Sequence, residues 1–358
     1  MAVAAALRPA DWLALAAAGR LFALGKNEDT RALAAVLPLA GVLDDSAAPG
    51  AQWAGLPLVR GDALPPGAAV VHCASSIAPV SAARRIEALT GGPAMDLAEL
   101  ARAVAGVPLP GFVREMREEL AAHADFWDAL PDRLADAESR HVLADLRRFR
   151  ESGDWRAMRA YRVRTEEQYF ESFLDHRPGD WFVDAGGFDG ATTIDFFAHC
   201  PQAGGAWFFE PSPSNMRLAR ERLPTELQAR MRFMPVGLAD RACTLRFDSR
   251  AGSASMVRED GDLVLPMDTL DALVDTPVHL IKMDLEGGEL AALQGARRHI
   301  AEDHPTLAIA CYHAAADLRR IAGFVLGVRD DYDLRLRHYT EGWSETVLFF
   351  LPRRGSAA

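Results

Sequence analysis

Acidic and imidazole side chains follow three apolar segments of the chain, at positions where a buried strand would end. In LIKMDLEGGEL, Lys282 and Asp284 fall on one face of an expected strand, because successive side chains alternate between faces. His313 ends the segment PTLAIACYH, and His338 follows the run LRLR. A carboxylate or a neutral imidazole at such a position can accept a proton from a hydroxyl group. The predicted catalytic residues are Asp284, His313, Lys282 and His338.

Two other interpretations of these residues stay open. Lys282 and Asp284 could form a buried ion pair that supports the strand, and a histidine at a strand end could be purely structural. A divalent cation could also be enclosed, since carboxylates together with an imidazole suit such ions. The residues concerned would be Asp284, Glu286, His313 and His338. Spacing along the chain does not show that these side chains converge, so we predict no metal ligands.

The stretch WFVDAGGFDGATTIDFF, from Trp181 to Phe197, joins an apolar run to an expected helix through a glycine-rich turn. The G-x-G-x-x-G spacing of a diphosphate-binding turn is absent, and Asp184 and Asp189 would repel a diphosphate. The next apolar run ends at Glu210, at a spacing that suits hydrogen bonds from ribose hydroxyls. These features predict a cationic, ribose-bearing cofactor such as S-adenosylmethionine. The alternative is that Glu210, before Pro211, only caps a turn.

Six blocks of sequence occur in an order that resembles the FkbM-like family of S-adenosylmethionine-dependent methyltransferases. They are FVDAGGFDGATT, FFEPSPSNMRLARERL, VGLAD, GSASM, PMDTLDAL and LIKMDLEGGELAALQGA. The resemblance covers about Gly179 to Pro352. It implies that Asp184 and Gly186 border the methionine part of the cofactor, Glu210 the ribose, and the segment Gly237–Asp240 the adenine. The predicted cofactor-binding residues are Asp184, Gly186, Gly187, Gly190, Glu210, Gly237 and Asp240.

The order of apolar and helical segments predicts an α/β protein with two Rossmann-like parts. The C-terminal part resembles a class I methyltransferase Rossmann-like sheet, and two final apolar runs joined by TEGWSE predict an antiparallel C-terminal hairpin. Apolar runs at 21–25, 41–45 and 68–75 predict a smaller N-terminal Rossmann-like domain. A charge-rich helical connector separates the two, either as a packing layer or as a lid or dimer contact. The predicted boundaries are 1–108, 109–178 and 179–354.

The N-terminal domain carries a reduced form of the same ligand-binding pattern. Gly25 follows its first expected strand, and Asp44 and Asp45 follow the second at the spacing of a ribose-binding acid. The phosphate-binding glycines are absent. This pattern leaves open either a structural or docking domain, or a pocket for a nucleotide or nucleotide-sugar.

Charge and cysteine usage restrict the partners and the compartment. The 358-residue chain has a formal net charge of -11 and no Lys/Arg-rich block, so we expect neither nucleic acid nor an anionic membrane as partner. The Ala-rich N-terminus is interrupted at Arg8 and Asp11 before a membrane span could form. Four dispersed cysteines, Cys73, Cys200, Cys243 and Cys311, fit a reduced cytoplasmic protein. A homodimer is left open.

These observations together predict an S-adenosylmethionine-dependent O-methyltransferase. The family resemblance implies carbohydrate modification, with a sugar hydroxyl of a glycan, a nucleotide-sugar or a glycosylated natural product as the acceptor. Two alternatives from other classes use the same sheet: an NAD-dependent oxidoreductase, and a non-catalytic binding or scaffold protein with a methyltransferase-like fold.

Overall fold

The computed structural model describes residues 8–92, 94–247 and 263–353. Of the six sequence blocks above, GSASM at 252–256 lies outside the described residues. The chain divides into two compact units, each assembled from three segments. The first unit comprises Met1–Ala124, His141–Thr165 and Tyr339–Ser344. The second unit comprises Asp125–Arg140, Glu166–His338 and Glu345–Ala358. The boundaries at 1–108, 109–178 and 179–354 remain a proposal.

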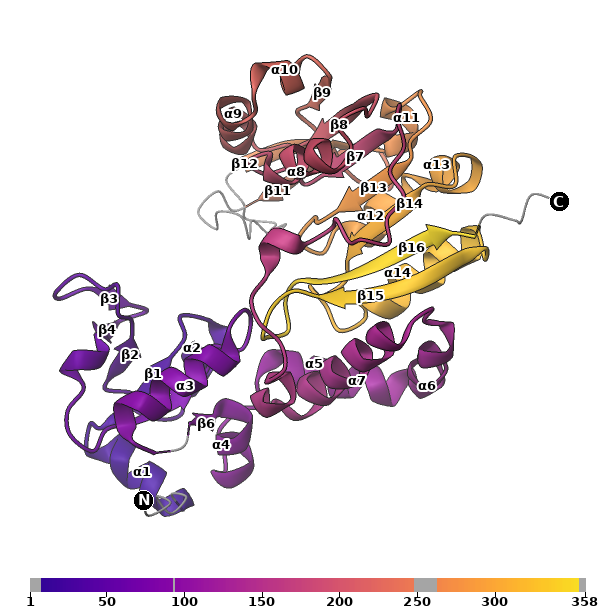
Figure 1. Ribbon diagram of the computed structural model, residues 1–358. Helices are drawn as coiled ribbons and strands as arrows, with labels where there is room; N and C mark the ends of the chain where they lie inside the picture. The colour runs from indigo at the N-terminus through magenta and orange to yellow at the C-terminus, as the bar shows by residue number, and fades with distance from the viewer. Residues whose placement is uncertain (1–7, 93, 248–262, 354–358) are drawn as a thin grey trace. The chain divides into compact units, whose positions relative to one another are not determined.

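The first unit contains a six-stranded sheet in the order β3-β4-β2-β1-β5-β6 (Figure 1). Every neighbouring pair is parallel except β3 and β4. The smaller Rossmann-like sheet expected from the N-terminal sequence is therefore confirmed. Its strands are β1 (Leu21–Leu24), β2 (Gly41–Leu43), β3 (Gln52–Trp53), β4 (Leu56–Val59), β5 (Ala69–His72) and β6 (Met95–Asp96). Its helices are α1 (Pro9–Ala17), α2 (Glu28–Ala34), η1 (Gly61–Ala63), α3 (Pro79–Thr90), α4 (Leu97–Ala103), α5 (Gly111–Ala122) and η2 (Trp155–Met158).

The two acidic residues after β2 are both engaged by groups of the protein itself. Asp44 contacts the Lys26 ammonium at 2.6 Å, and this hydrogen bond lowers the pKa of Asp44 to about 2. Asp45 accepts a hydrogen bond from the backbone N–H of Gly61 at 2.8 Å and pairs with Arg85 at 2.9 Å. These contacts favour the structural interpretation of the acidic pair over a nucleotide pocket.

Asp96 makes the stability of the first unit depend on pH. Its Oδ1 caps α4 by accepting a hydrogen bond from Glu99 N, while its Oδ2 is buried without a partner among the described residues. Burial raises the pKa of Asp96 from 3.8 to about 6. A carboxyl group with a raised pKa in the folded state stabilises that state below its unfolded pKa, and this contribution is lost as the pH rises through about 6.

We expect Asp96→Asn to remove this loss, because asparagine keeps the capping oxygen and carries no charge. Relative to the variant, the free energy of unfolding of the wild type should fall by up to about 3 kcal/mol between pH 4 and pH 8. Each unit of difference between the folded and unfolded pKa corresponds to about 1.4 kcal/mol. Urea unfolding across this range measures the difference. Asp62→Asn, at an exposed carboxylate of the same unit, is the control and should follow the wild type. Parallel pH curves for wild type and Asp96→Asn would contradict the expectation.

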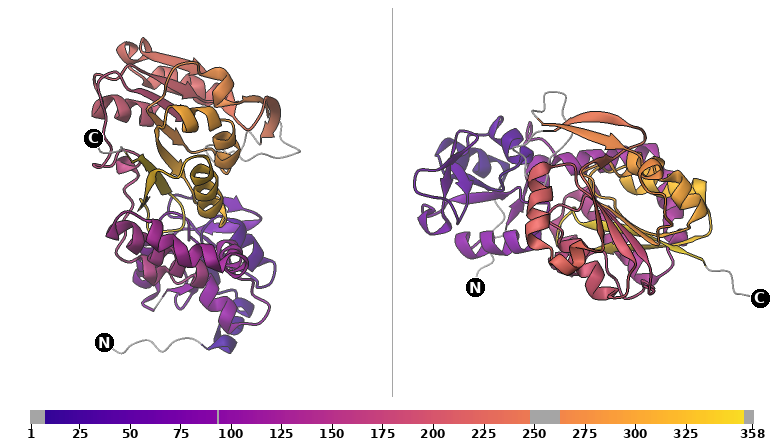
Figure 2. Two further views of the ribbon diagram at one scale, coloured as in Figure 1. Left: turned by 90° about the vertical axis from the view of Figure 1, so that its right-hand side faces the viewer. Right: turned by 90° about the horizontal axis from the view of Figure 1, so that it is seen from above.

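The second unit contains a seven-stranded sheet in the order β15-β16-β14-β13-β7-β8-β9. β16 runs antiparallel to both of its neighbours, and the other adjacent pairs are parallel. Helices lie on both faces of the sheet (Figures 1 and 2). The strands of this sheet are β7 (Trp181–Ala185), β8 (Gly205–Phe209), β9 (Met231–Met234), β13 (Leu280–Met283), β14 (Thr306–Ala310), β15 (Tyr332–His338) and β16 (Thr346–Pro352). This arrangement confirms the predicted Rossmann-like sheet with a C-terminal antiparallel hairpin.

The helices that accompany this sheet connect successive strands or precede it. Six larger and smaller helices follow strands in chain order: α8 (Ala191–His199), α9 (Pro213–Arg222), α10 (Thr225–Gln228), α12 (Glu289–Gln294), α13 (Arg297–Glu302) and α14 (Asp317–Val328). Preceding the sheet are α6 (Ala124–Arg133), α7 (Ala137–Ser152) and η3 (Thr165–Glu167). The residues of α7 from His141 onward belong to the first unit.

One apolar run of the sequence divides between two sheets. MRFMPVGLAD reads as a single strand, but the structure ends β9 at Met234 and starts β10 (Gly237–Leu238) after Pro235. β10 pairs with β12 (Leu263–Asp268), which also pairs with β11 (Cys243–Phe247), and the short helix α11 (Leu270–Leu273) follows. Proline donates no hydrogen bond to a strand ladder, so Pro235 separates the two pairings.

The tip of the β15–β16 hairpin, Tyr339–Ser344, groups with the first unit. Its Glu341 carboxylate accepts hydrogen bonds from the Ser81 backbone N–H at 2.7 Å and from the Ser81 hydroxyl at 2.8 Å. Ser344 donates to the carbonyl oxygen of Ser76 at 2.9 Å. The first unit is therefore completed by residues near the end of the chain.

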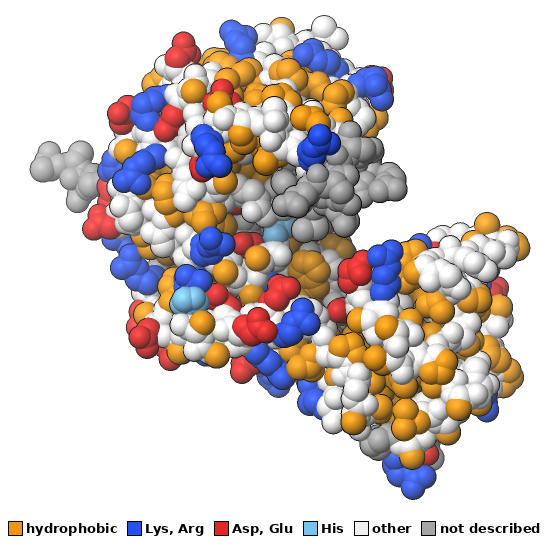
Figure 3. Space-filling model, turned by 180° about the vertical axis from the view of Figure 1, so that it is seen from behind, with side chains coloured by type: hydrophobic (Ala, Val, Ile, Leu, Met, Phe, Trp, Pro, Cys, Tyr) orange, Lys and Arg blue, Asp and Glu red, His pale blue; other side chains and the backbone are white. Residues whose placement is uncertain are grey.

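Among the helices that the structure describes, none combines the length and the apolar character needed to cross a bilayer. On the face shown in Figure 3, Lys and Arg side chains lie among Asp and Glu side chains over the second unit.

Candidate functional site

A buried ion pair joins β7 and β13, which are neighbouring strands of the seven-stranded sheet. Lys282 on β13 lies in register with Asp184 on β7, and the Lys282 Nζ is 3.2 Å from the Asp184 carboxylate. Asp184 also accepts a hydrogen bond from the Thr193 hydroxyl of α8 at 2.7 Å. The Asp184 and Lys282 side chains are 0% and 4% exposed. This geometry favours a structural role for Lys282, with Asp184 rather than Asp284 as its partner.

The turn after β7 requires glycine at two positions. Gly186 has φ +75°, and a Cβ there would lie 2.0 Å from the carbonyl oxygen of Asp284. A Cβ on Gly187 would lie 2.1 Å from the ring of Phe208. The Lys282 ammonium donates to the carbonyl oxygen of Gly186 at 2.7 Å, which fixes the turn to the end of β13. Gly190, with φ +81°, begins α8.

Glu210 connects the end of β8 to this glycine turn. Its carboxylate accepts hydrogen bonds from the backbone N–H groups of Phe188 at 3.0 Å and Ser212 at 2.8 Å, and from the Asn215 amide at 3.4 Å. Burial raises the pKa of Glu210, and the two backbone hydrogen bonds oppose that change. A carboxylate offers about four acceptor positions, so one position remains for a ligand. Phe188, 40% exposed, places an aromatic ring at the tip of the same turn.

Gly237 and Asp240, assigned to adenine by the resemblance, lie in and after β10 outside the seven-stranded sheet. Asp240 forms an ion pair with Arg241 at 3.0 Å. A cavity of about 540 Å³ lies nearby, lined by residues that include Pro211 and Pro235. Gly237 and Asp240 are not among its lining residues.

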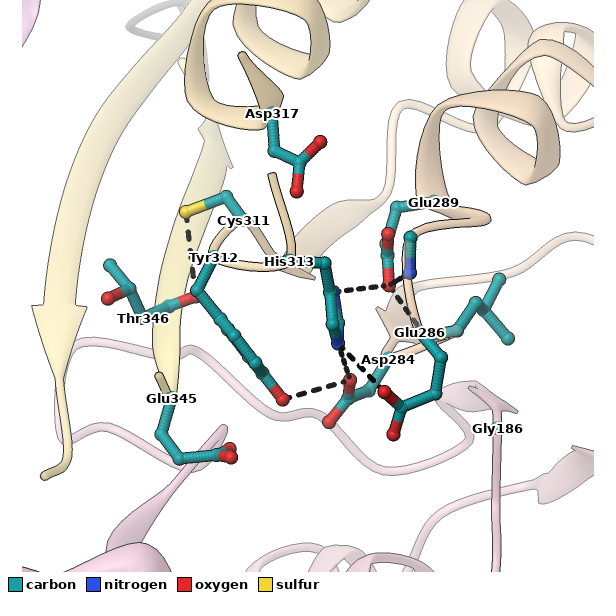
Figure 4. Close-up of polar contacts among 12 residues, drawn as sticks. Gly186, Asp284, Glu286, Glu289, Cys311, Tyr312, His313, Asp317, Glu345 and Thr346 are labelled. Carbon is teal, nitrogen blue, oxygen red and sulfur yellow. Dashed lines mark hydrogen bonds and ion pairs between the residues drawn. The ribbon is translucent and has the colours of Figure 1, made fainter. Parts of the chain in front are cut away.

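Three carboxylates face the imidazole of His313, which follows β14 (Figure 4). We call these four residues the His313 cluster: Asp284, Glu286, Glu289 and His313. His313 Nε2 lies 3.6 Å from the Asp284 carboxylate and 3.5 Å from that of Glu286. His313 Nδ1 lies 3.3 Å from Glu289 Oε1. Glu289, 1% exposed, also accepts a hydrogen bond from the backbone N–H of Leu285 at 2.6 Å. The sheet therefore brings Asp284 and His313 together, as the positions of strand ends predicted.

The carboxylates change the charge state of His313. Burial opposes a positive charge on the ring, but the contacts with Glu286, Glu289 and Asp284 outweigh burial and raise the pKa of His313 to about 11. In this arrangement the ring holds its proton at neutral pH. A protonated imidazole donates rather than accepts a proton, so the geometry favours a carboxylate over His313 as the general base.

Asp284 is held by two tyrosine hydroxyl groups. Tyr169 donates to Asp284 Oδ2 at 2.8 Å, and Tyr312 lies 3.4 Å from Oδ1. Burial raises the pKa of both tyrosines, so both hydroxyls stay protonated and can donate. Tyr169 comes from the segment expected as a connector, and its position in the sequence gave no indication of this contact. Tyr312 follows the end of a strand, so the search for polar side chains at strand ends could have selected it.

His338, the fourth predicted catalytic residue, ends β15 and is 1% exposed. Its Nδ1 lies 2.9 Å from the Thr346 hydroxyl of the neighbouring strand. Among the described residues, the possible metal ligands whose atoms lie within 4.8 Å of one another are Asp284, Glu289 and His313. The structure therefore does not bring His338 into this group.

Backbone strain is concentrated at the same edge of the second unit. Six non-glycine residues in the described ranges have a positive φ, and four of them are Tyr169, Phe188, Glu286 and Glu345. Tyr169 donates to Asp284, Phe188 donates to Glu210, and Glu286 faces His313. Glu345 accepts a hydrogen bond from Gln168, the neighbour of Tyr169 in the chain. Such conformations cost about 1–3 kcal/mol each and cluster at functional sites in proteins.

The sequence and the fold both match known methyltransferases. Residues 184–333 match the family model described as the methyltransferase FkbM domain. This part of the chain is similar to the methyltransferase FkbM domain. The matching part includes Asp184, Glu210 and the His313 cluster.

The FkbM domain also has relatives among solved structures. A crystal structure of methyltransferase FkbM from Methylobacillus flagellatus KT has a TM-score of 0.72 at 24% identity, over 93% of this chain and 90% of that chain. This likeness shows that the fold extends over both units. An rRNA methylase from Streptococcus thermophilus has a TM-score of 0.34 at 15% identity, over 49% of this chain and 89% of that chain. No curated protein matches the chain in sequence.

Proposed function

We propose that the protein is an S-adenosylmethionine-dependent O-methyltransferase that acts on a sugar hydroxyl. One observation carries the cofactor: in an FkbM domain, the Glu210 carboxylate at the end of β8 is hydrogen-bonded to the glycine turn after β7. An acid at this position of a doubly wound sheet accepts hydrogen bonds from ribose. The sugar acceptor rests on the family resemblance of the sequence.

The residues at this edge of the sheet fit such a cofactor. Glu210 has one acceptor position left for a ribose hydroxyl, and the exposed ring of Phe188 offers an apolar surface next to it. The carboxylates of Asp284, Glu286 and Glu289 give the neighbouring edge a negative charge, which suits the sulfonium and ammonium groups. Asp184 has its carboxylate buried against Lys282, so its part in cofactor binding would be to support the turn.

The proposed reaction needs a positioned hydroxyl and an acceptor for its proton. The hydroxyl oxygen forms a bond to the methyl carbon while the carbon–sulfur bond breaks and its electron pair stays on sulfur. Asp284 is the carboxylate best placed to take the proton, because both tyrosine hydroxyls hold it at the strand end. Alignment of the two reactants would supply most of the acceleration.

Calorimetry tests the cofactor directly. We expect S-adenosylmethionine and S-adenosylhomocysteine to bind the wild type, and Glu210→Gln to weaken both by about tenfold or more, since hydrogen bonds to a charged group contribute about 1.5–3 kcal/mol. Glu226→Gln, at an exposed position on α10, is the matched control and should bind as the wild type does. Binding of NAD(H) without S-adenosylmethionine would overturn the proposal in favour of an oxidoreductase.

Transfer of a labelled methyl group to nucleotide-sugars and glycosides tests the acceptor class. We expect an acid-stable product whose methyl group lies on a sugar oxygen. Tight cofactor binding without transfer to any sugar would instead support a binding or scaffold protein. Cytoplasmic location and a homodimer remain part of the proposal, together with the sugar substrate.

A further inference from the structure

The geometry of the His313 cluster points to a binding site for a divalent cation. We propose that Asp284, Glu289 and His313 hold one divalent cation at the carboxyl edge of the seven-stranded sheet, with Glu286 facing the same imidazole. Three potential ligand atoms of the first three residues lie within 4.8 Å of one another. They come from the end of β13, the first turn of α12 and the segment after β14, so the fold rather than local sequence assembles them.

The imidazole is the observation that distinguishes this site from a simple group of acids. Both ring nitrogens of His313 are buried, and within the described part of the chain neither forms a hydrogen bond. Carboxylate oxygens nevertheless face the ring from both sides, at 3.3 Å from Nδ1 and at 3.5 Å and 3.6 Å from Nε2. Figure 4 shows these carboxylates converging on the ring, and a bound cation would displace the ring proton, because an imidazole that ligates a metal is neutral.

The charge balance of the cluster also favours a bound cation, because three carboxylates leave a net negative charge even when the His313 ring carries its proton. Three carboxylates surround one imidazole, and among the described residues no Lys or Arg forms an ion pair with Asp284, Glu286 or Glu289. Glu289 is 1% exposed and pairs with His313, and a coordinated metal would take over this pairing when the imidazole is neutral. The nearby Lys282 does not relieve this charge, because its ammonium is paired with Asp184.

The ligand types suit a cation of the Mn²⁺ class. Carboxylates favour Mg²⁺ and Mn²⁺, and an imidazole favours transition metals and zinc, so a mixed set suits Mn²⁺ best. An ammonium or sulfonium group would be attracted to the carboxylates, but it would gain nothing from two buried imidazole nitrogens.

A cation in this position would act on the acceptor, and this role rests on the proposed function. It would bind the hydroxyl oxygen and lower the pKa of that hydroxyl, as metal ions do for bound water. Asp284 would then be a ligand, and the proton would pass to Glu286, whose side chain is 34% exposed and reaches solvent. The coordinated oxygen would then form a bond to the methyl carbon while the carbon–sulfur bond breaks, as in the reaction above.

The test measures cation binding without the cofactor. The full-length protein, freed of metal with EDTA and then dialysed, is titrated by calorimetry with MnCl₂, MgCl₂ and ZnCl₂ separately. We expect one bound ion per chain, and at least tenfold weaker binding in Glu289→Gln and in His313→Gln. Asp333→Asn, at a half-exposed carboxylate of the same unit, should bind as the wild type does.

Thermal unfolding in EDTA checks the fold of each variant, and Asp284→Asn replaces any variant that does not fold. An increase in Tm with the bound ion in the wild type but not in the variants would give independent support. No saturable binding of any of the three ions, or binding unchanged in both variants, would overturn the site. S-adenosylmethionine binding measured in EDTA reports separately on the proposed function, so the two can fail independently.

Discussion

Replacing Lys282 by methionine should lower the free energy of unfolding of the second unit by about 3–5 kcal/mol, because it leaves Asp184 as a buried charge without a partner. The same ammonium holds the carbonyl oxygens of Ala185 and Gly186 at 3.3 Å and 2.7 Å. Loss of Lys282 would therefore also release the turn that carries the proposed cofactor contacts. Urea unfolding, followed by tryptophan fluorescence, measures the change.

Two controls separate this buried pair from ordinary surface charge. Arg353→Met breaks an ion pair with Asp333 whose side chains are 55% and 50% exposed, and it should cost at most about 1 kcal/mol. The double variant Asp184→Asn/Lys282→Met should be more stable than Lys282→Met alone, because the unpaired charge is gone. If Lys282→Met unfolds like the wild type and loses only turnover, Lys282 is catalytic, as its strand position first predicted.

Gly186→Ala should destabilise the second unit by about 2–5 kcal/mol. The left-handed backbone at φ +75° costs an L-residue about 1–2 kcal/mol, and the clash of a new Cβ with the carbonyl oxygen of Asp284 adds about 1–3 kcal/mol. Relief of that clash requires the end of β13 to move, and Asp284 moves with it. We therefore expect weaker cofactor binding as well as a lower unfolding midpoint.

A glycine in the same unit provides the matched control. Gly323 lies inside α14, and a Cβ there meets nothing within 4 Å. Gly323→Ala should raise stability by about 0.5–1 kcal/mol, because alanine loses less backbone entropy in a helix. Two Gly→Ala changes with opposite signs would show that the cost at position 186 comes from the turn. A loss below about 1 kcal/mol at Gly186 would contradict the close packing of the turn against Asp284.

The sheets could be predicted because short apolar runs alternate with helical segments in both parts of the chain. The runs beginning at Leu21, Gly41 and Ala69 became parallel strands of the first unit, and the final hairpin became β15 and β16. The division of MRFMPVGLAD at Pro235 was foreseeable from proline chemistry. Its consequence, a separate sheet with β11 and β12, depends on strand partners that no local pattern specifies.

The site was only partly predictable, because strand-end rules give positions and not partners. They selected Asp284 and His313, which the structure places in contact. They paired Lys282 with Asp284 along one strand, whereas the register between β13 and β7 pairs it with Asp184. Tyr169 reaches Asp284 from 115 residues away in the chain, and its neighbours in sequence carry no pattern that indicates it.

The segment Tyr339–Ser344 also determines when the first unit can complete its folding during synthesis. The ribosome makes the β-strands of the first unit early, but the acceptor for both Ser81 donors, Glu341, emerges only after the whole region that matches the FkbM domain. Nascent chains that end before this segment would carry a first unit with exposed, unpaired groups on α3. Cutting the gene at a conventional domain boundary would therefore yield an incomplete N-terminal fragment, prone to aggregate, rather than an independent module.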